Sequence, residues 1–138
     1  MTMRSLADRL RACCTGAVRD ALRTMGHERA VLPPGIEPLD PTLKLACPVR
    51  TVSGHVDRTT SRRGIPDAYG APVDIGGAAI SKGDYLLADR DGVVIVPKAF
   101  AGEGVLRTEE VASTETEMRK ALVGGMGPVD AYNAYGKF

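Results

Sequence analysis

The chain has 138 residues, of which 43% are hydrophobic and 25% are charged, which is typical of one soluble globular domain over residues 1–138. The formal net charge of +1 argues against nucleic acid as the main partner. Its apolar runs fall far short of the roughly 20 residues that a membrane helix needs, which argues against a membrane partner. The first residues, MTMRSLADRLRACC, lack the apolar region of a secretory signal, so we expect a cytoplasmic protein with three reduced cysteines.

The N-terminal part is predicted to be helical and then extended. Apolar residues recur at helical spacing over residues 6–25, with Ser5 as a natural N-cap and Gly26 as a natural C-cap. This segment could also divide into two helices, with Thr15 capping the second. Four prolines follow within residues 31–41 and predict an extended connection, because proline is excluded from helix interiors and central strands.

Short strands dominate the middle of the chain, and helices return at its end. We predict a strand over residues 43–52 that Pro48 interrupts. After a junction, HVDRTTSRRGIPD (residues 55–67), four strands with turn residues between them are expected at 73–75, 78–80, 85–88 and 93–96. Helices are predicted at 109–122 and 128–135, after weaker helical turns that contain two glycines. The layout indicates an α+β fold, with one small, mostly antiparallel sheet flanked by N- and C-terminal helices.

Three stretches resemble the RraA-like family, which includes the regulator of ribonuclease activity A and the class II 4-hydroxy-4-methyl-2-oxoglutarate aldolases. Its members are also labelled demethylmenaquinone methyltransferase-like. The stretches are TGAVRDALRTMGHERAVLPPGIEPLDPTLKLACPVRTVSG (15–54), PVDIGGAAISKGDYLLADRDGVVIVP (72–97) and EVASTETEMRKALVGGMGPVDAYNAYG (110–136). The resemblance implies a swivelling β/β/α-type domain and a homo-oligomer, a trimer or a hexamer.

The resemblance also implies that a segment is absent. Family members carry a central βαβ segment whose Gly-rich and Arg-Asp motifs supply the substrate-binding Arg and the metal-bound Asp of the aldolases. This chain instead passes from Gly54 to Gly64 in a few residues. We therefore expect a truncated RraA-like domain.

An aldolase or oxaloacetate-type decarboxylase of this family requires a divalent cation, Mg²⁺ or Mn²⁺, that polarises a small 2-oxo acid, a cationic group for its carboxylate, and a base. The junction contains residue types suited to these roles. The candidates there are His55 as the base, Asp57 on the metal, and Arg58, Arg62 and Arg63 on the substrate. The resemblance adds Glu115 as a metal ligand that a neighbouring subunit would supply.

Three functions remain open. The first is a metal-dependent carbon–carbon lyase. The second is a non-catalytic regulatory or oligomer-forming protein with a protein partner, and the third is a divergent enzyme of a specialised pathway. The alternative interpretation of DRTTSRRG is a solvated loop. Asp84, Asp89 and Asp91 lie beside turn glycines and are expected to be structural.

Overall fold

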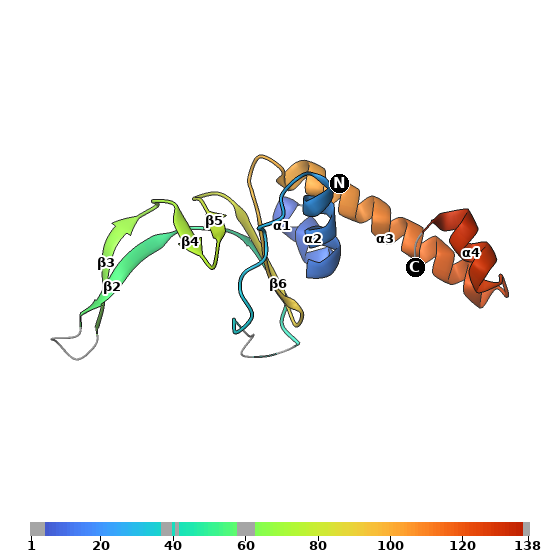
Figure 1. Ribbon diagram of the computed structural model, residues 1–138, viewed down its shortest axis with the longest axis horizontal. Coiled ribbons are helices and arrows are strands. Elements are labelled where there is room, and N and C mark those ends of the chain that lie inside the picture. The colour runs from blue at the N-terminus through green and yellow to red at the C-terminus, as the bar shows by residue number, and fades with distance from the viewer. Residues whose placement is uncertain (1–4, 37–39, 41, 58–62, 137–138) are drawn as a thin grey trace.

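The computed structural model describes residues 5–36, 40, 42–57 and 63–136, with the backbone alone at 55–57 and 63. Figure 1 shows three parts in a row: a β-hairpin at one end, a central body, and a pair of helices at the other end. The elements are α1 (Leu6–Ala12), α2 (Thr15–Thr24), β1 (Leu45–Pro48), β2 (Val52–Asp57), β3 (Arg63–Tyr69), β4 (Val73–Ile75), β5 (Ala78–Ile80), β6 (Tyr85–Asp89), β7 (Gly92–Val96), α3 (Ala101–Val123) and α4 (Pro128–Tyr135). The predicted α+β class is confirmed.

The central body is built on a three-stranded antiparallel sheet in the order β1-β6-β7. A tight turn joins β6 to β7, so that Asp89 pairs with Gly92. The proline-rich segment covers the outer edge of β7, because the Leu32 amide donates to the Val93 carbonyl (3.0 Å) and the Ile95 amide donates to the Ala30 carbonyl (2.7 Å). This edge is therefore closed to further strands.

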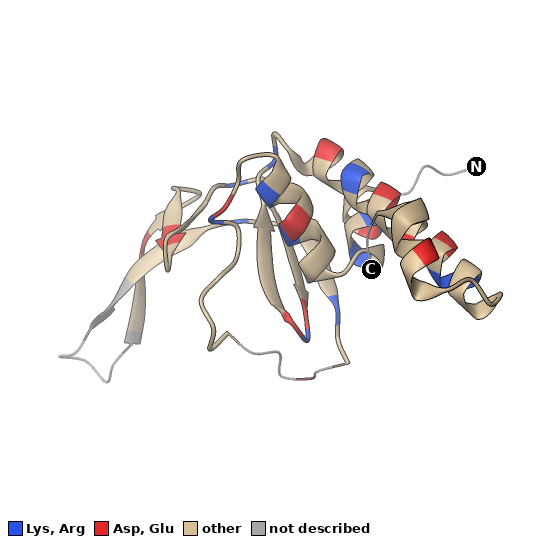
Figure 2. Ribbon diagram, turned by 45° about the vertical axis from the view of Figure 1, so that its right-hand side comes forward, with Lys and Arg blue, Asp and Glu red and all other residues tan. Residues whose placement is uncertain are grey.

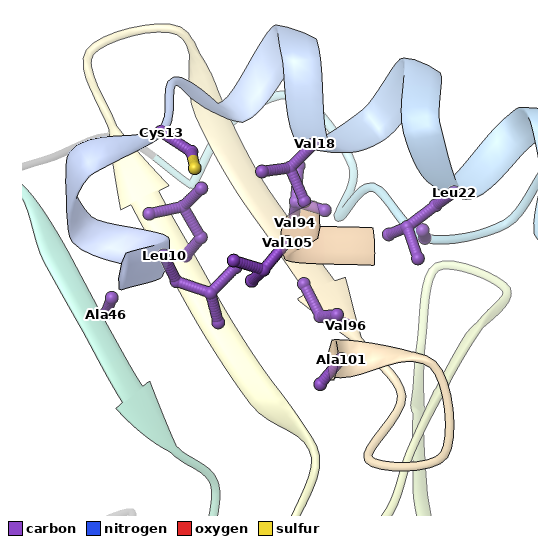
Figure 3. Packing of buried hydrophobic residues seen from close by; sticks show 11 residues of the cluster. Leu10, Cys13, Val18, Leu22, Ala46, Val94, Val96, Ala101 and Val105 are labelled. Carbon is purple, nitrogen blue, oxygen red and sulfur yellow. The ribbon is translucent and has the colours of Figure 1, made fainter. Parts of the chain in front are cut away.

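The core lies between this sheet and the helices α1, α2 and the first half of α3 (Figure 3). The side chains that meet there are aliphatic, and they include Leu10, Val18, Leu22, Leu87, Val94, Val96 and Val105, each at most 2% exposed. Shortening one of the buried leucines to alanine would cost about 2–5 kcal/mol of stability, because it removes apolar contacts and leaves a cavity.

The N-terminal helical segment divides in two, but its second cap differs from the prediction. Ser5 caps α1 as expected, since its hydroxyl accepts from the Asp8 amide at 3.2 Å. The N-cap of α2 is Cys14, whereas Thr15 is the first helical residue and its hydroxyl donates to Asp89 instead. Gly26 does end α2: its φ is 85°, its own amide donates to the Arg23 carbonyl, and the His27 amide donates to the Leu22 carbonyl, which together form a Schellman motif.

Helix α3 is longer than the predicted 109–122 because packing compensates for its glycines. It begins at Ala101, so Gly102 and Gly104 lie inside its first turns. Gly104 is buried, and a Cβ there would approach the Leu22 side chain of α2 to 3.7 Å. Small residues at this position let α3 lie close to α2, and the buried contact offsets the low helix propensity of glycine.

The sheet prediction was wrong in two respects. Within the described residues the strands form three small antiparallel sheets rather than one, since β2 pairs with β3 and β4 pairs with β5 separately from the central sheet. The predicted strand at 43–52 is two strands, β1 and β2, and much of the junction is β-hairpin rather than loop. A register shift between Ser53 and Gly54, opposite Pro66, breaks the alternation that would have revealed this hairpin.

Candidate functional site

The predicted catalytic residues of the junction lie at the outer end of the β2–β3 hairpin. In the backbone, His55 pairs with Ile65 and Asp57 pairs with Arg63. Arg58 and Arg62 lie outside the described residues, as do the side chains of His55, Asp57 and Arg63. The hairpin therefore brings two strands of candidate residues to one place in the fold, and their catalytic roles stay predictions.

Glu115 lies in another part of the molecule. It is exposed on α3, which runs away from the central body toward the end opposite the hairpin (Figure 1). The predicted metal ligands Asp57 and Glu115 are thus not brought together within one chain. Among the described residues, no group of three or more His, Cys, Asp or Glu side chains could hold a metal ion. The expected Mg²⁺ or Mn²⁺ site stays a prediction.

Glu115 borders two adjoining hollows on one face of α3. One, of about 400 Å³, lies between α2 and α3 and contains the carboxylates of Asp20, Glu110 and Glu115. The other, of about 240 Å³, lies between α3 and α4 and shares Glu110, Val111 and Glu115 with the first. Arg107 also lines the first hollow, but its guanidinium donates to Glu103 at 2.6 Å. The face is predominantly acidic, and acidic residues recur along α3 (Figure 2).

Asp89, singled out by its motif, has a structural role. Its carboxylate is 9% exposed and accepts from the Thr15 hydroxyl (2.7 Å), the Thr15 amide (2.9 Å) and the Asp91 amide (3.0 Å). Burial would raise the pKa of this carboxyl, but these hydrogen bonds, chiefly those from Thr15, hold it below its ordinary value. Asp89 therefore satisfies a first-turn amide of α2 from a distant strand.

Asp84 and Asp91 also act in turns, as expected. The buried Asp84 carboxylate accepts from the Ser81 amide at 2.7 Å and from the Lys98 amide at 2.9 Å, and so ties the turn before β6 to the end of β7. Asp91 is exposed and lies 3.6 Å from Arg90. The Asp84 carboxylate thus stabilises a turn, whereas the Asp91 side chain lies exposed beside Arg90.

Two apolar surfaces were missed by the sequence interpretation. The first, the hairpin patch, consists of Val52 and Tyr69 at the inner end of the β2–β3 hairpin, which are 54% and 75% exposed. Val52 and Tyr69 face each other across the two strands. The sequence contains the apolar residues 52 and 69, but it does not contain the strand register that places them opposite each other.

The second surface, the arm-end patch, consists of Val123, Met126 and Val129 at the turn between α3 and α4. Their exposed fractions are 86%, 39% and 72%. Helix α4 uses Ala131, which is fully buried, to pack on α3 and leaves Val129 facing away. The available sequence signal was the apolar residue Val129, two positions before the small residue Ala131 in the predicted helix 128–135.

Comparison with solved structures identifies the fold of this chain. No protein-family model matches the sequence. The structure of Streptomyces coelicolor RraAS2, an unusual member of the RNase ES inhibitor RraA protein family, matches with a TM-score of 0.75 and 18% identity, over 87% of this chain and 99% of that chain. The chain has an RraA-like fold. The missing central segment stays a prediction.

Two further structures share this RraA-like fold. An uncharacterized protein from Pseudomonas syringae pv. tomato str. DC3000 matches with a TM-score of 0.82 and 20% identity, over 97% of this chain and 95% of that chain. A structure described as belonging to novel cellulases from gut-associated microbes matches with a TM-score of 0.75 and 21% identity, over 85% of this chain and 89% of that chain. The differing descriptions illustrate that a fold does not fix a function.

The helices were also compared with the requirements of a membrane span. Within the part of the chain that the structure describes, no helix is both long enough and apolar enough to cross a bilayer.

Proposed function

We propose that this RraA-like protein is a non-catalytic binding protein that works as a homo-oligomer, a trimer or a hexamer. The observation that carries the proposal is the pair of projecting arms. Among the described residues, β2 and β3 contact mainly each other, and α4 contacts mainly α3. Each arm exposes apolar side chains: the hairpin patch lies at the inner end of the hairpin, and the arm-end patch lies at the turn between α3 and α4.

The energetics of the hairpin support assembly. A two-stranded hairpin is marginally stable in water by itself and needs a packing partner for a stable hydrophobic face. Tyr69, at 75% exposed, leaves much of a large aromatic surface in water. Burying such surface is worth about 25 cal/mol per Å², so association would stabilise both the hairpin and the assembly.

The class of function is supported by one structural neighbour. RraAS2 belongs to a family of RNase ES inhibitors, and inhibitors act by binding rather than by catalysis. At 18% identity this neighbour supports the fold, and a regulatory role for the present chain is part of the proposal.

A second candidate is the metal-dependent lyase acting on a small 2-oxo acid. The exposure of Glu115 beside Asp20 and Glu110 favours it, because these carboxylates are open to a group from another chain. A site of this kind would combine Glu115 of one chain with Asp57 and Arg58 of another, and would exist only in an oligomer.

Two measurements test the proposal. Sedimentation velocity of the purified full chain should give a species larger than the 14.6 kDa monomer. Pyruvate release from oxaloacetate and from 4-hydroxy-4-methyl-2-oxoglutarate, with Mg²⁺ or Mn²⁺ and with EDTA, should show no enzymatic turnover. Metal-dependent turnover that is lost in both Asp57→Ala and Arg58→Ala would establish the lyase instead. A monomer at every concentration would refute the oligomeric binding protein.

A further inference from the structure

We infer that the face of α3 between α2 and α4 is a docking groove for a basic amphipathic helix of a partner protein. The groove consists of the two adjoining hollows, of about 400 Å³ and about 240 Å³. This inference rests on the proposed binding function, and it names the surface that receives the partner and the chemistry of the segment that docks there.

The groove follows one stripe of α3. The α3 residues that line it recur at the three- and four-residue spacing of a helix face, and they are Arg107, Glu110, Val111, Thr114 and Glu115. A stripe from residue 107 to residue 115 is about 12 Å long, since each residue of a helix rises about 1.5 Å. With α2 at one end and α4 at the other, the groove has room for about two turns of a docked helix.

The apolar lining of the groove consists of small side chains. Ala17 and Ala21 of α2 lie there together with Val111 of α3. Small side chains let the backbone of a docked segment come close, and an apolar lining stabilises apolar side chains that leave water. The occupant therefore presents apolar side chains along one face.

The charged lining of the groove is acidic and open to cations. Neither Glu110 nor Glu115 forms an ion pair in the part of the chain that the structure describes. The Asp20 side chain is 70% exposed and lies 3.9 Å from Arg19. The guanidinium of Arg107, which also lines the groove, is already paired along α3. The groove therefore attracts positive charge.

The arrangement of these carboxylates favours a segment with several cations over a single ion. Although three of them line one hollow, no group of three or more His, Cys, Asp or Glu side chains among the described residues could hold a metal ion. Carboxylates spread along an apolar groove instead match lysine or arginine side chains spaced along a helix. The occupant is thus a helix whose basic residues flank an apolar stripe.

Synthetic peptides test the groove by fluorescence anisotropy with the full chain in EDTA. The probe is a labelled helical peptide of about 15 residues, in which lysines flank a stripe of alanine and leucine. The matched ligands are a scrambled peptide of the same composition and a peptide with glutamate in place of each lysine. We expect the probe to bind, and added salt to weaken its binding. The scrambled peptide should bind about tenfold more weakly, and the acidic peptide should not bind.

Two variants separate the charge of the groove from its shape. Glu110→Gln combined with Glu115→Gln should raise the dissociation constant of the probe about tenfold, because two carboxylates are lost. Ala17→Leu keeps every charge and should raise it about fivefold, because a larger side chain narrows the groove. Glu117→Gln is the matched control and should change it less than about twofold, since Glu117 lies outside the groove and pairs with Lys120 at 3.0 Å. Circular dichroism melts establish that the variants are folded.

Other results would overturn the inference, and sedimentation velocity distinguishes them from a failure of the proposed function. Equal binding of the ordered and scrambled peptides, or an unchanged dissociation constant in Ala17→Leu, would mean that charge alone attracts the probe. An oligomeric chain that binds no peptide would refute the inference and leave the proposed function standing. An oligomer that dissociates when both glutamates are neutralised would instead place a second copy in the groove. A monomer that binds the probe would support the inference and refute the proposed oligomer alone.

Discussion

Replacing Asp89 with alanine should destabilise the fold by removing a carboxylate that joins β6 to α2. The carboxylate accepts three hydrogen bonds, from the Thr15 hydroxyl at 2.7 Å, the Thr15 amide at 2.9 Å and the Asp91 amide at 3.0 Å. Thr15 is 3% exposed, so water reaches its orphaned donors poorly. The change therefore leaves buried polar groups without an acceptor.

The expected loss follows from these bonds. A hydrogen bond to a charged group contributes about 1.5–3 kcal/mol, and losing a helix cap costs about 1 kcal/mol. The three bonds share one carboxylate and are not additive, so we expect Asp89→Ala to lower the free energy of unfolding by about 2–4 kcal/mol at neutral pH. Urea denaturation followed by circular dichroism measures this difference. Asp91→Ala in the same turn is the control, because its side chain is exposed and should contribute about 0.5 kcal/mol or less.

The same substitution predicts a pH dependence. The pKa of Asp89 is lower in the folded protein than in the unfolded chain, where it is about 3.9. Its contribution is therefore complete above that unfolded value and is lost as the pH falls through the lower folded pKa. The stability gap between the unmodified chain and Asp89→Ala should narrow only below about pH 4. Equal stabilities at neutral pH, or a gap that widens in acid, would refute the role assigned to this carboxylate.

A pair of glycine substitutions and a cysteine-labelling experiment test the packing. Gly76→Ala should destabilise the protein by about 1–3 kcal/mol more than Gly77→Ala, measured by thermal melting, since both glycines have positive φ but only a Cβ at Gly76 would overlap the Pro33 ring. Equal losses would mean that Pro33 does not lie against this turn. Maleimide should label the exposed Cys14 well before the buried Cys13, whose pKa is raised by burial, as peptide mass spectrometry over time would establish. Labelling of both at one rate would contradict the buried position of Cys13.

Turn and cap chemistry was predictable from the sequence because it is local. Ser5 as the cap of α1, Gly26 at the end of α2, and a turn between β6 and β7 depend on residues within a few positions of one another. The same reasoning placed α4 at Pro128–Tyr135, where proline opens the helix and glycine ends it.

Long-range packing decided what the sequence pattern could not. The first turns of α3, which contain two glycines, form where this helix packs against α2, and Thr15 loses its expected capping role to a carboxylate 74 positions away. The hairpin of β2 and β3 was obscured by the register shift opposite Pro66. These outcomes depend on partners that periodicity along one segment does not contain.

For the candidate site, too, local features were predictable from the sequence and long-range features were not. The sequence by itself determined the residue types and the α+β class, because these follow from composition and from local periodicity. Only the tertiary structure decided that β2, which carries Asp57, and the projecting part of α3, which carries Glu115, lie on opposite sides of the central body, and that each arm exposes apolar side chains. Distance between residues and exposure to solvent are properties of the packed chain, since each is set by which elements lie against which.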